Sequence, residues 1–291
     1  MSIVTLPHGE VHVRTAGPEL GAAGPPVVFV HGVLVDGTLW GAVADLLAGA
    51  GVRSFAPDLP LGAHRRPVAD DADQTPRGVA RQVLALLDAL ELTDVTLVGN
   101  DTGGAICQYL LDTDASRIGR VVLTNCDAFE QFPPPSLRRF IHLLRRPTAL
   151  AGVAQAMRST SFRHGKLGYG PFARSYDEAM TAAWVEPARL DADVRRDIAR
   201  VAAAIDPDDL AAVGGRLHRF DGPVRLVWGT DDPYFTLELA GRLAAAFTDA
   251  EVTEVPGART FVPLDAPDRV AAAILEVADV TPVDRSAVDA G

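Results

Sequence analysis

A glycine-rich segment, GNDTGG at residues 99–104, carries the side chain best placed for covalent chemistry. It follows an apolar run and opens an apolar pattern of helical spacing, which predicts a sharp turn from a strand into a helix. Such a turn needs glycines because its backbone is strained and packs closely against neighbouring chain. The side chain that it lifts above the sheet edge is Asp101, whose carboxylate can attack carbon and form an ester.

Hydrolysis of that ester usually requires a base that activates water. The segment VWGTDDP at 227–233 ends a strand-like run, and the G-x-x-D spacing favours Asp232 as the acid that orients the base. The alternative is that both of its aspartates are ordinary turn residues. The segment GARTFVP at 257–263 follows the last strand, where a base histidine is expected, but it carries Thr260. A threonine hydroxyl cannot act as a base near neutral pH.

A third segment, His31-Gly32-Val33, ends the apolar run at 27–30. A strand ending in His-Gly places a backbone N–H beside the turn that carries the aspartate. We therefore expect the amides of Val33 and Thr102 to form an oxyanion hole, with the Val33 side chain only bordering the pocket.

The elements that must position these residues alternate along the chain. Strand-like runs separated by helical patterns predict an α/β fold, a mainly parallel sheet covered by helices on both faces. Thr75-Pro76 marks the start of one helix. The strand-like runs are 11–13, 26–30, 52–56, 95–98, 120–124, 224–228 and 251–255.

The alternation stops after Asp127 and resumes at Pro223. Between them the sequence shows helix-like stretches separated by proline-rich and glycine-rich breaks, and no clear strand. We interpret residues 128–221 as a helical lid inserted over the carboxyl ends of the strands, with 1–127 and 222–291 forming the core.

The composition of the chain limits which classes of binding partner and cofactor are expected. The 291 residues have a net charge of −11, which argues against nucleic acid. No apolar run is long enough for a membrane span, and no secretory signal is evident. Cys107 and Cys126 lie in apolar segments and are interpreted as buried free thiols. No phosphate loop, dinucleotide fingerprint or metal-ligand cluster appears. A cytoplasmic protein that takes a small-molecule substrate without cofactor or metal is expected.

In order and spacing, the His31-Gly32 pair, residues 99–104 and residues 228–232 resemble the landmarks of the α/β-hydrolase fold family, in its haloalkane dehalogenase and epoxide hydrolase branch. The resemblance implies an aspartate nucleophile and a hydrolase. It also shows two departures. Thr102 stands where many relatives have a tryptophan that helps to hold a halide, and Thr260 aligns with the general-base histidine.

Two candidate substrate contacts follow from the same resemblance, and two more from residue type and place in the sequence. Tyr169 and Tyr176 could donate hydrogen bonds to an epoxide or carbonyl oxygen, as lid tyrosines do in epoxide hydrolase relatives, or could simply pack. Trp40 is either core or pocket wall. Asp36 is either polar pocket lining or a loop-turn aspartate.

Three functions stay open at this point. Asp101 could use direct carboxylate acid/base chemistry on a small apolar epoxide-, halide- or ester-like substrate, because like charges at close range raise one carboxyl pKa. It could instead form an ester that is not hydrolysed, a covalent trap. The protein could also be a non-catalytic binder of a small ligand. Lid histidines His142 and His164 are the best replacements for the missing base.

Overall fold

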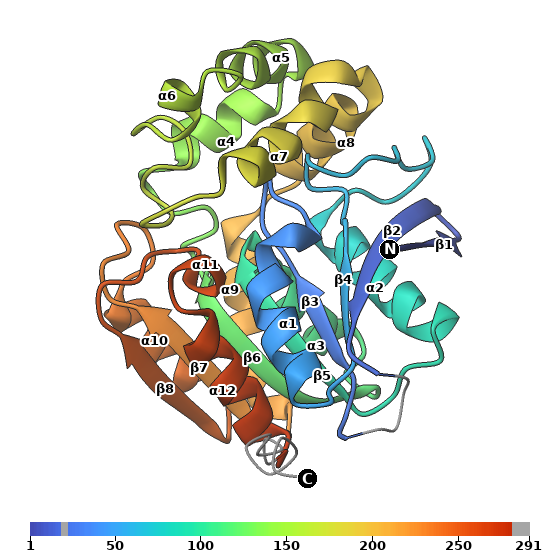
Figure 1. Cartoon of the computed structure of the whole chain (residues 1–291), viewed down its shortest axis with the longest axis vertical. Coiled ribbons are helices and arrows are strands. Elements are labelled where there is room, and N and C mark those ends of the chain that lie inside the picture. The colour runs from blue at the N-terminus through green and yellow to red at the C-terminus, as the bar shows by residue number, and fades with distance from the viewer. Residues whose placement is uncertain (19–22, 281–291) are drawn as a thin grey trace, which may run out of the picture.

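The computed structural model describes residues 1–18 and 23–280, so the end of the predicted core segment, 281–291, lies outside the described residues. An eight-stranded sheet has the order β1-β2-β4-β3-β5-β6-β7-β8 (Figure 1). Pairs that involve β2 are antiparallel, and the others are parallel. The strands are β1 (Ser2–Leu6), β2 (Gly9–Ala16), β3 (Val27–Val30), β4 (Ser54–Pro57), β5 (Val95–Asp101), β6 (Ile118–Cys126), β7 (Val224–Gly229) and β8 (Ala250–Val255).

Helices cover both faces of the sheet, as the α/β prediction requires. Along β3, Val28 and Val30 join one apolar core while Val27 and Phe29 join the other, because successive strand side chains point to opposite faces. One core is covered by α1 (Gly41–Gly49) and α12 (Pro267–Val277). The other is covered by α2 (Pro76–Ala89), α3 (Thr102–Thr113), α9 (Pro207–Gly214) and α10 (Leu237–Ala244).

The local signals in the sequence match these elements. Thr75 caps α2, because its hydroxyl accepts a 3.0 Å hydrogen bond from the Gly78 amide, and Pro76 occupies the first helical turn. All seven predicted strands are present. The strand that was not predicted is β1, an edge strand whose residues are mostly exposed and therefore lack an apolar pattern.

The helical insertion, residues 128–221, leaves the sheet after β6 and returns at β7, with no strand among these residues, all of which are described. Its first helices stand over the carboxyl ends of the strands (Figure 1). They are α4 (Arg138–Leu144), α5 (Pro147–Ala156), α6 (Thr160–Arg163), α7 (Glu178–Leu190) and α8 (Ala192–Ala203).

The last part of the insertion packs elsewhere. Helix α9 lies against α3, and the 3₁₀ turn η2 (Leu217–Arg219) follows it on the same side. Arg216 donates to Asp112 of α3 at 2.6 Å, and Arg77 of α2 donates to Asp209 at 2.7 Å. These ion pairs, with the buried apolar face of α9, hold it on the core layer. Helices α4 to α8 thus form the part of the insertion that stands over the strand ends, and the lid bounds 128 and 221 remain a prediction.

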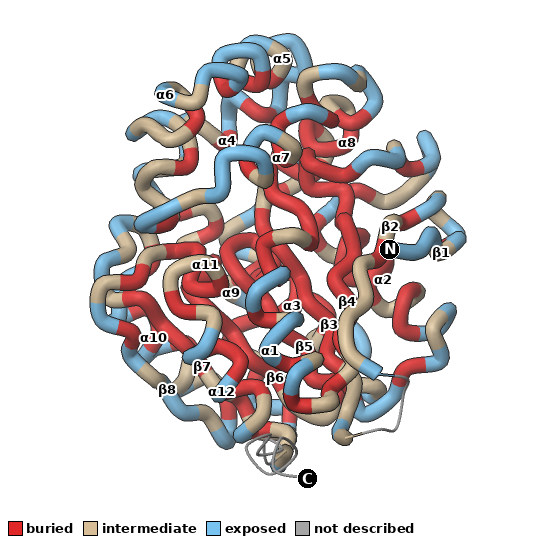
Figure 2. Tube along the Cα trace, in the orientation of Figure 1, coloured by how far each residue is buried: buried red, intermediate tan, exposed pale blue. Residues whose placement is uncertain are grey.

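Burial follows the same division (Figure 2). The central strands are buried along their length, whereas the outer faces of α5 and α6 are exposed. Both cysteines are buried and free, as interpreted from the sequence. Within residues 1–18 and 23–280, no helix combines the length and hydropathy that crossing a bilayer demands. Two further short elements complete the fold. They are the 3₁₀ turn η1 (Gly37–Trp40) and the one-turn helix α11 (Val262–Asp265).

Candidate active site

Asp101 sits in a strained backbone conformation at the junction of β5 and α3, with φ 54° and ψ −132°. A non-glycine residue rarely adopts positive φ, and such strain concentrates at functional positions. The neighbouring glycines have no room for a side chain. A Cβ on Gly103 would lie 2.2 Å from the Val30 carbonyl oxygen, and one on Gly104 would lie 2.3 Å from Cβ of Cys126. Close packing therefore fixes the turn that presents the aspartate.

The Asp101 carboxyl group occupies the predicted oxyanion hole. The Val33 amide donates to its Oδ2 at 3.3 Å, and the Thr102 amide lies close enough to lower the pKa of the carboxyl. Gly32 lies so close that a Cβ there would be 2.1 Å from Oδ2. The structure thus brings Val33, Thr102 and Asp101 together, and a glycine is required between His31 and Val33 for this approach.

Asp232 lies next to this group at the end of β7. Its Oδ1 accepts hydrogen bonds from the amides of Tyr234 at 2.8 Å and Phe235 at 3.2 Å, and its Oδ2 accepts one from Nδ2 of Asn125 at 2.8 Å. The side chain of Thr260 is fully buried. Its hydroxyl lies close enough to lower the pKa of Asp232, although the geometry falls short of a regular hydrogen bond.

A buried amide ties the three segments together. Nδ2 of Asn100 donates to the Thr260 carbonyl at 2.6 Å, to Thr124 Oγ1 at 2.8 Å and to the Asn125 carbonyl at 3.3 Å. Asn125 in turn accepts from the Gly229 amide at 2.6 Å. The asparagine before the strained aspartate therefore anchors the loop that carries Thr260.

A further carboxyl group, Asp127, was not identified from the sequence. It follows β6 and is 2% exposed, its Oδ2 accepts a 3.0 Å hydrogen bond from the Thr102 hydroxyl, and its Oδ1 has no partner. Its amide donates to the Asp101 carbonyl at 3.4 Å. The available signal was its place directly after a strand adjacent to β5, where carboxyl ends of parallel strands converge.

The three carboxyl groups have raised pKa values. Burial raises the pKa of Asp101 to about 7, helped by the charge of Asp232 and opposed by the Thr102 and Val33 amides. Burial, then the charge of Asp101, raises the pKa of Asp127 well above its ordinary range, and burial also raises that of Asp232. Among the described residues, no cationic side chain pairs with them. Protons must therefore offset their mutual repulsion near neutral pH.

Among the described residues, no histidine forms a hydrogen bond or an ion pair with Asp101, Asp127 or Asp232. Nε2 of His31 accepts from the Leu59 amide at 2.8 Å, and burial lowers its pKa. His164 contacts the Thr181 hydroxyl at 2.8 Å and stacks on Tyr176. His142 is exposed on α4. Neither of the two candidate histidines reaches the cavity described next.

A cavity of about 300 Å³ lies between the helical insertion and the oxyanion segment. Its lining is mainly apolar, as is usual for small-molecule sites. Ser136 and Lys166 are exposed, and the other polar side chains are two tyrosines. The lining residues are Val33, Leu34, Ser136, Leu137, Phe140, Met157, Lys166, Leu167, Gly168, Tyr169, Phe172, Tyr234 and Phe261.

Of the four substrate contacts expected from the sequence, only Tyr169 lines this cavity, and its hydroxyl donates to the Leu34 carbonyl. The Tyr176 hydroxyl donates to the Tyr169 carbonyl. Trp40 is fully buried and stacks on Phe29 at 4.7 Å.

Asp36 likewise serves the fold. It caps η1 by accepting from the Thr38 amide at 2.8 Å, and it pairs with Arg14 at 3.3 Å. Both Trp40 and Asp36 therefore match their alternative interpretations, core residue and turn residue. The structure does not bring either of them to the cavity.

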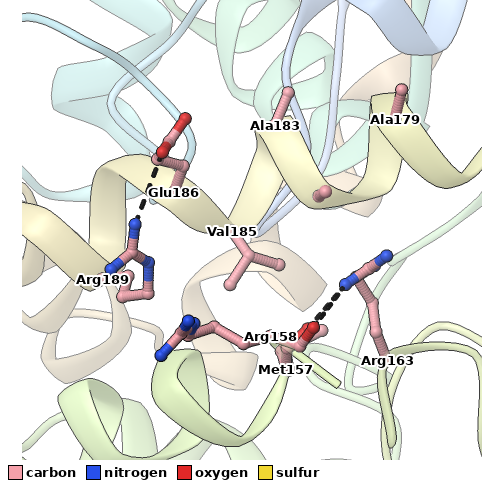
Figure 3. Close-up of a pocket in the computed structure, with 9 residues that line it drawn as sticks. Met157, Arg158, Arg163, Ala179, Ala183, Val185, Glu186 and Arg189 are labelled. Atoms are coloured by element: carbon pink, nitrogen blue, oxygen red, sulfur yellow. Dashed lines mark hydrogen bonds and ion pairs between the residues drawn. The ribbon is translucent and has the colours of Figure 1, made fainter. Parts of the chain in front are cut away.

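A second hollow of about 350 Å³ lies inside the insertion, away from these carboxyl groups (Figure 3). Two of its three arginines are engaged: Nη1 of Arg163 donates to the Met157 carbonyl at 2.9 Å, and Arg189 pairs with Glu186 at 3.4 Å. The guanidinium of Arg158 has no hydrogen bond or ion pair among the described residues. The cavity beside Val33 is the better candidate for the substrate site, because Val33 contacts Asp101.

The sheet order, the helices on both of its faces and the helical insertion define an α/β-hydrolase architecture. Residues 27–273 match the model of the Alpha/beta hydrolase family, and the chain belongs to that family. It is 27% identical to haloalkane dehalogenase 2 of Mycobacterium tuberculosis over 279 residues, 92% of this chain and 91% of that protein.

Two other comparisons agree. An epoxide hydrolase of Caballeronia sordidicola is 36% identical over 93 residues, 32% of this chain and 27% of that enzyme. The crystal structure of an α/β-hydrolase fold protein from Burkholderia ambifaria superposes with a TM-score of 0.76 at 26% identity, over 94% and 97% of the two chains. The expected fold and the expectation of a hydrolase-type enzyme are confirmed.

Proposed function

We propose that the protein is an enzyme that acts on a small, largely apolar molecule through Asp101, and that carboxyl groups replace the usual imidazole base. The observation that carries this proposal is the group formed by the buried carboxyls of Asp101 and Asp127 and the half-buried carboxyl of Asp232, which has no histidine or cationic partner among the described residues. A group whose pKa lies close to the operating pH exchanges protons most effectively, and burial brings Asp101 to that range.

For an epoxide, the step would balance as follows. Ionised Asp101 takes a proton from water, the water oxygen bonds to a ring carbon, and the ring C–O bond breaks. The proton then returns to the alkoxide, which leaves a diol and an ionised Asp101. Such direct use of a carboxylate needs no ester and therefore no base to hydrolyse one. In this scheme the helices over the strand ends act as a lid that excludes bulk water.

An oxygen-bearing substrate fits the site better than an alkyl halide. The Thr102 hydroxyl is engaged by Asp127, and the Trp228 and Trp184 indoles donate to the Phe235 carbonyl at 2.9 Å and to Asp36 at 3.1 Å. The third indole N–H, that of Trp40, has no hydrogen-bond partner but is fully buried, and Trp40 does not line the cavity. Within the described residues, no indole N–H lines the cavity where it could hold a leaving halide.

The rate should depend on pH through Asp101. Because the ionised form accepts the proton, kcat/KM for a reactive epoxide should be low in acid, rise through about pH 7 and level off above it. A pH–rate profile measured between pH 5 and 9 checks this. A profile that is flat across the range, or one that falls as the pH rises through 7, would contradict a base role for Asp101.

A second candidate function is a covalent trap. It is favoured by the Val33 and Thr102 amides, which hold the Asp101 carboxyl in the arrangement that a nucleophile would need, with no base to hydrolyse the ester. Intact-protein mass after exposure to an alkyl halide or an epoxide distinguishes the two. A stable increase by the mass of the alkyl group or the epoxide supports the trap, whereas diol formation without added mass supports acid/base turnover.

The variant Thr260→His tests whether only the base is missing. If Asp101 can form an ester, an imidazole beside Asp232 should activate water and allow repeated ester hydrolysis, a gain of at least about 100-fold within the usual range for general-base catalysis. Loss of the native activity without such a gain would instead support carboxyl chemistry that depends on the site as it stands. Thr260→Val, which keeps the shape without an ionisable group, is the matched control.

A further inference from the structure

The hydroxyl groups of the four tyrosines are not equally available. Those of Tyr169 and Tyr176 donate to backbone carbonyls, so neither lid tyrosine offers its O–H to a ligand. Tyr109 lies in the core on the far side of α3, where its ring packs under Arg77 and its hydroxyl faces Asp209. Tyr234 is the remaining tyrosine, and within the described residues its hydroxyl has no hydrogen-bond partner.

Tyr234 is held beside the carboxyl groups by its backbone. It follows β7 in the loop of Asp232, and its amide donates to Oδ1 of that residue at 2.8 Å. Its ring packs against Phe172 with centroids 4.9 Å apart and lines the cavity next to Val33 and Phe261. The half-buried Tyr234 side chain therefore lies in the loop of Asp232 at the wall of the candidate substrate site, and it also borders a hollow on the side of Glu130 and Thr236.

The charges around Tyr234 keep it a donor. Burial raises its pKa, and the nearby carboxyls of Asp232 and Asp101 raise it further. A phenol under these conditions stays protonated at neutral pH, so it offers an O–H and no charge. Ser136 and Lys166 are the other polar lining side chains besides Tyr169, and both are exposed to solvent.

We propose that the Tyr234 hydroxyl donates a hydrogen bond to an oxygen of the substrate and so selects molecules with a carbonyl or epoxide oxygen on an apolar body. This rests on the proposed function for the reaction but not for binding. In the epoxide scheme, the same hydrogen bond stabilises the alkoxide as the C–O bond breaks. On this proposal, the hydrogen bond to the substrate oxygen comes from Tyr234 in the core, and not from the lid tyrosines Tyr169 and Tyr176.

Binding of two ligands of similar size tests the proposal without turnover. Acetophenone carries a carbonyl acceptor and ethylbenzene does not. Wild-type protein should bind acetophenone more tightly, and Tyr234→Phe should lose about 3- to 10-fold in affinity for acetophenone alone, the range of one neutral hydrogen bond. Tyr176→Phe, whose hydroxyl is engaged by the backbone, should keep the preference.

A second measurement, made on the wild-type protein, keeps the proposal testable if Tyr234→Phe folds poorly. In protein labelled at tyrosine Cζ with carbon-13, acetophenone should shift one resonance, which is absent from Tyr234→Phe, and ethylbenzene should shift it less. Equal affinity of wild type for both ligands, no binding of acetophenone, or an unchanged preference in Tyr234→Phe would each overturn the proposal. Failure of the reaction assigned to Asp101 would show only in turnover, so the two hypotheses are separable.

Discussion

Asp101→Asn should lower turnover at least about 1000-fold, because the amide can neither accept a proton nor attack carbon. The substitution keeps the shape of the side chain, and its carbonyl oxygen can still accept from the Val33 amide. The fold should therefore survive. Steady-state kinetics with a reactive epoxide, together with circular dichroism and thermal unfolding, check the two halves of this expectation.

The same variant should also change stability in a pH-dependent way. Well below pH 3.8 the Asp101 carboxyl is protonated in both the folded and the unfolded chain, so it has no linkage effect. As the pH rises to 7, the unfolded chain ionises first and stability is lost. The pKa of Asp101 is about 7 in the folded chain and 3.8 ordinarily. This difference lowers the free energy of unfolding by roughly 4 kcal/mol above pH 7. Asp101→Asn should recover much of it at pH 8.

Urea unfolding at pH 4 and pH 8 measures that difference. The matched control is Asp231→Asn, an exposed neighbour of Asp232 outside the buried carboxyl group, which should change neither activity nor stability by more than about 0.5 kcal/mol. Turnover that persists in Asp101→Asn would show that this aspartate is not the reacting carboxyl. Equal stability of the variant and wild type at pH 8 would show that burial of the ionised Asp101 carboxyl does not lower the free energy of unfolding.

The fold could be predicted because its determinants are local. The four residues of β3 alternate between two cores, so they read as a continuous apolar run, which is typical of a strand buried on both faces. The cap at Thr75 and the glycines of the aspartate turn are likewise set by neighbours in the sequence. The edge strand β1 lacks such a signal because it is held by pairing with β2 and buries little.

The site was only partly predictable because side-chain partners are not local. The spacing pointed to Asp101, Asp232 and Thr260, yet Asp127 became visible only when β6 was placed beside β5. The two alternatives for the lid tyrosines, substrate donor or packing residue, could not be separated from the sequence for a related reason. Whether a hydroxyl is free depends on which backbone carbonyl lies opposite it, and Tyr169 meets that of Leu34, far away in sequence.

Asn100→Leu should destabilise the protein by about 3–5 kcal/mol, because leucine has the same number and branching of side-chain heavy atoms as asparagine but no hydrogen-bonding group. The amide of Asn100 satisfies the Thr260 carbonyl, the Asn125 carbonyl and the Thr124 hydroxyl, all of them buried. Leucine would leave these acceptors unpaired, and each such loss costs about 1–3 kcal/mol, partly relieved by rearrangement.

The control for this variant lies on the same strand. Thr96 is fully buried on β5, and its hydroxyl has no partner, so Thr96→Val should be neutral or stabilising by urea unfolding. If both substitutions cost the same, packing rather than the hydrogen bonds of Asn100 would hold the site together. The shortest hydrogen bond of the Asn100 side chain is to the Thr260 carbonyl. If only Asn100→Leu lowers the free energy of unfolding, and the protein that stays folded has lost activity, then Asn100 sets the position of the Thr260 loop against Asp232.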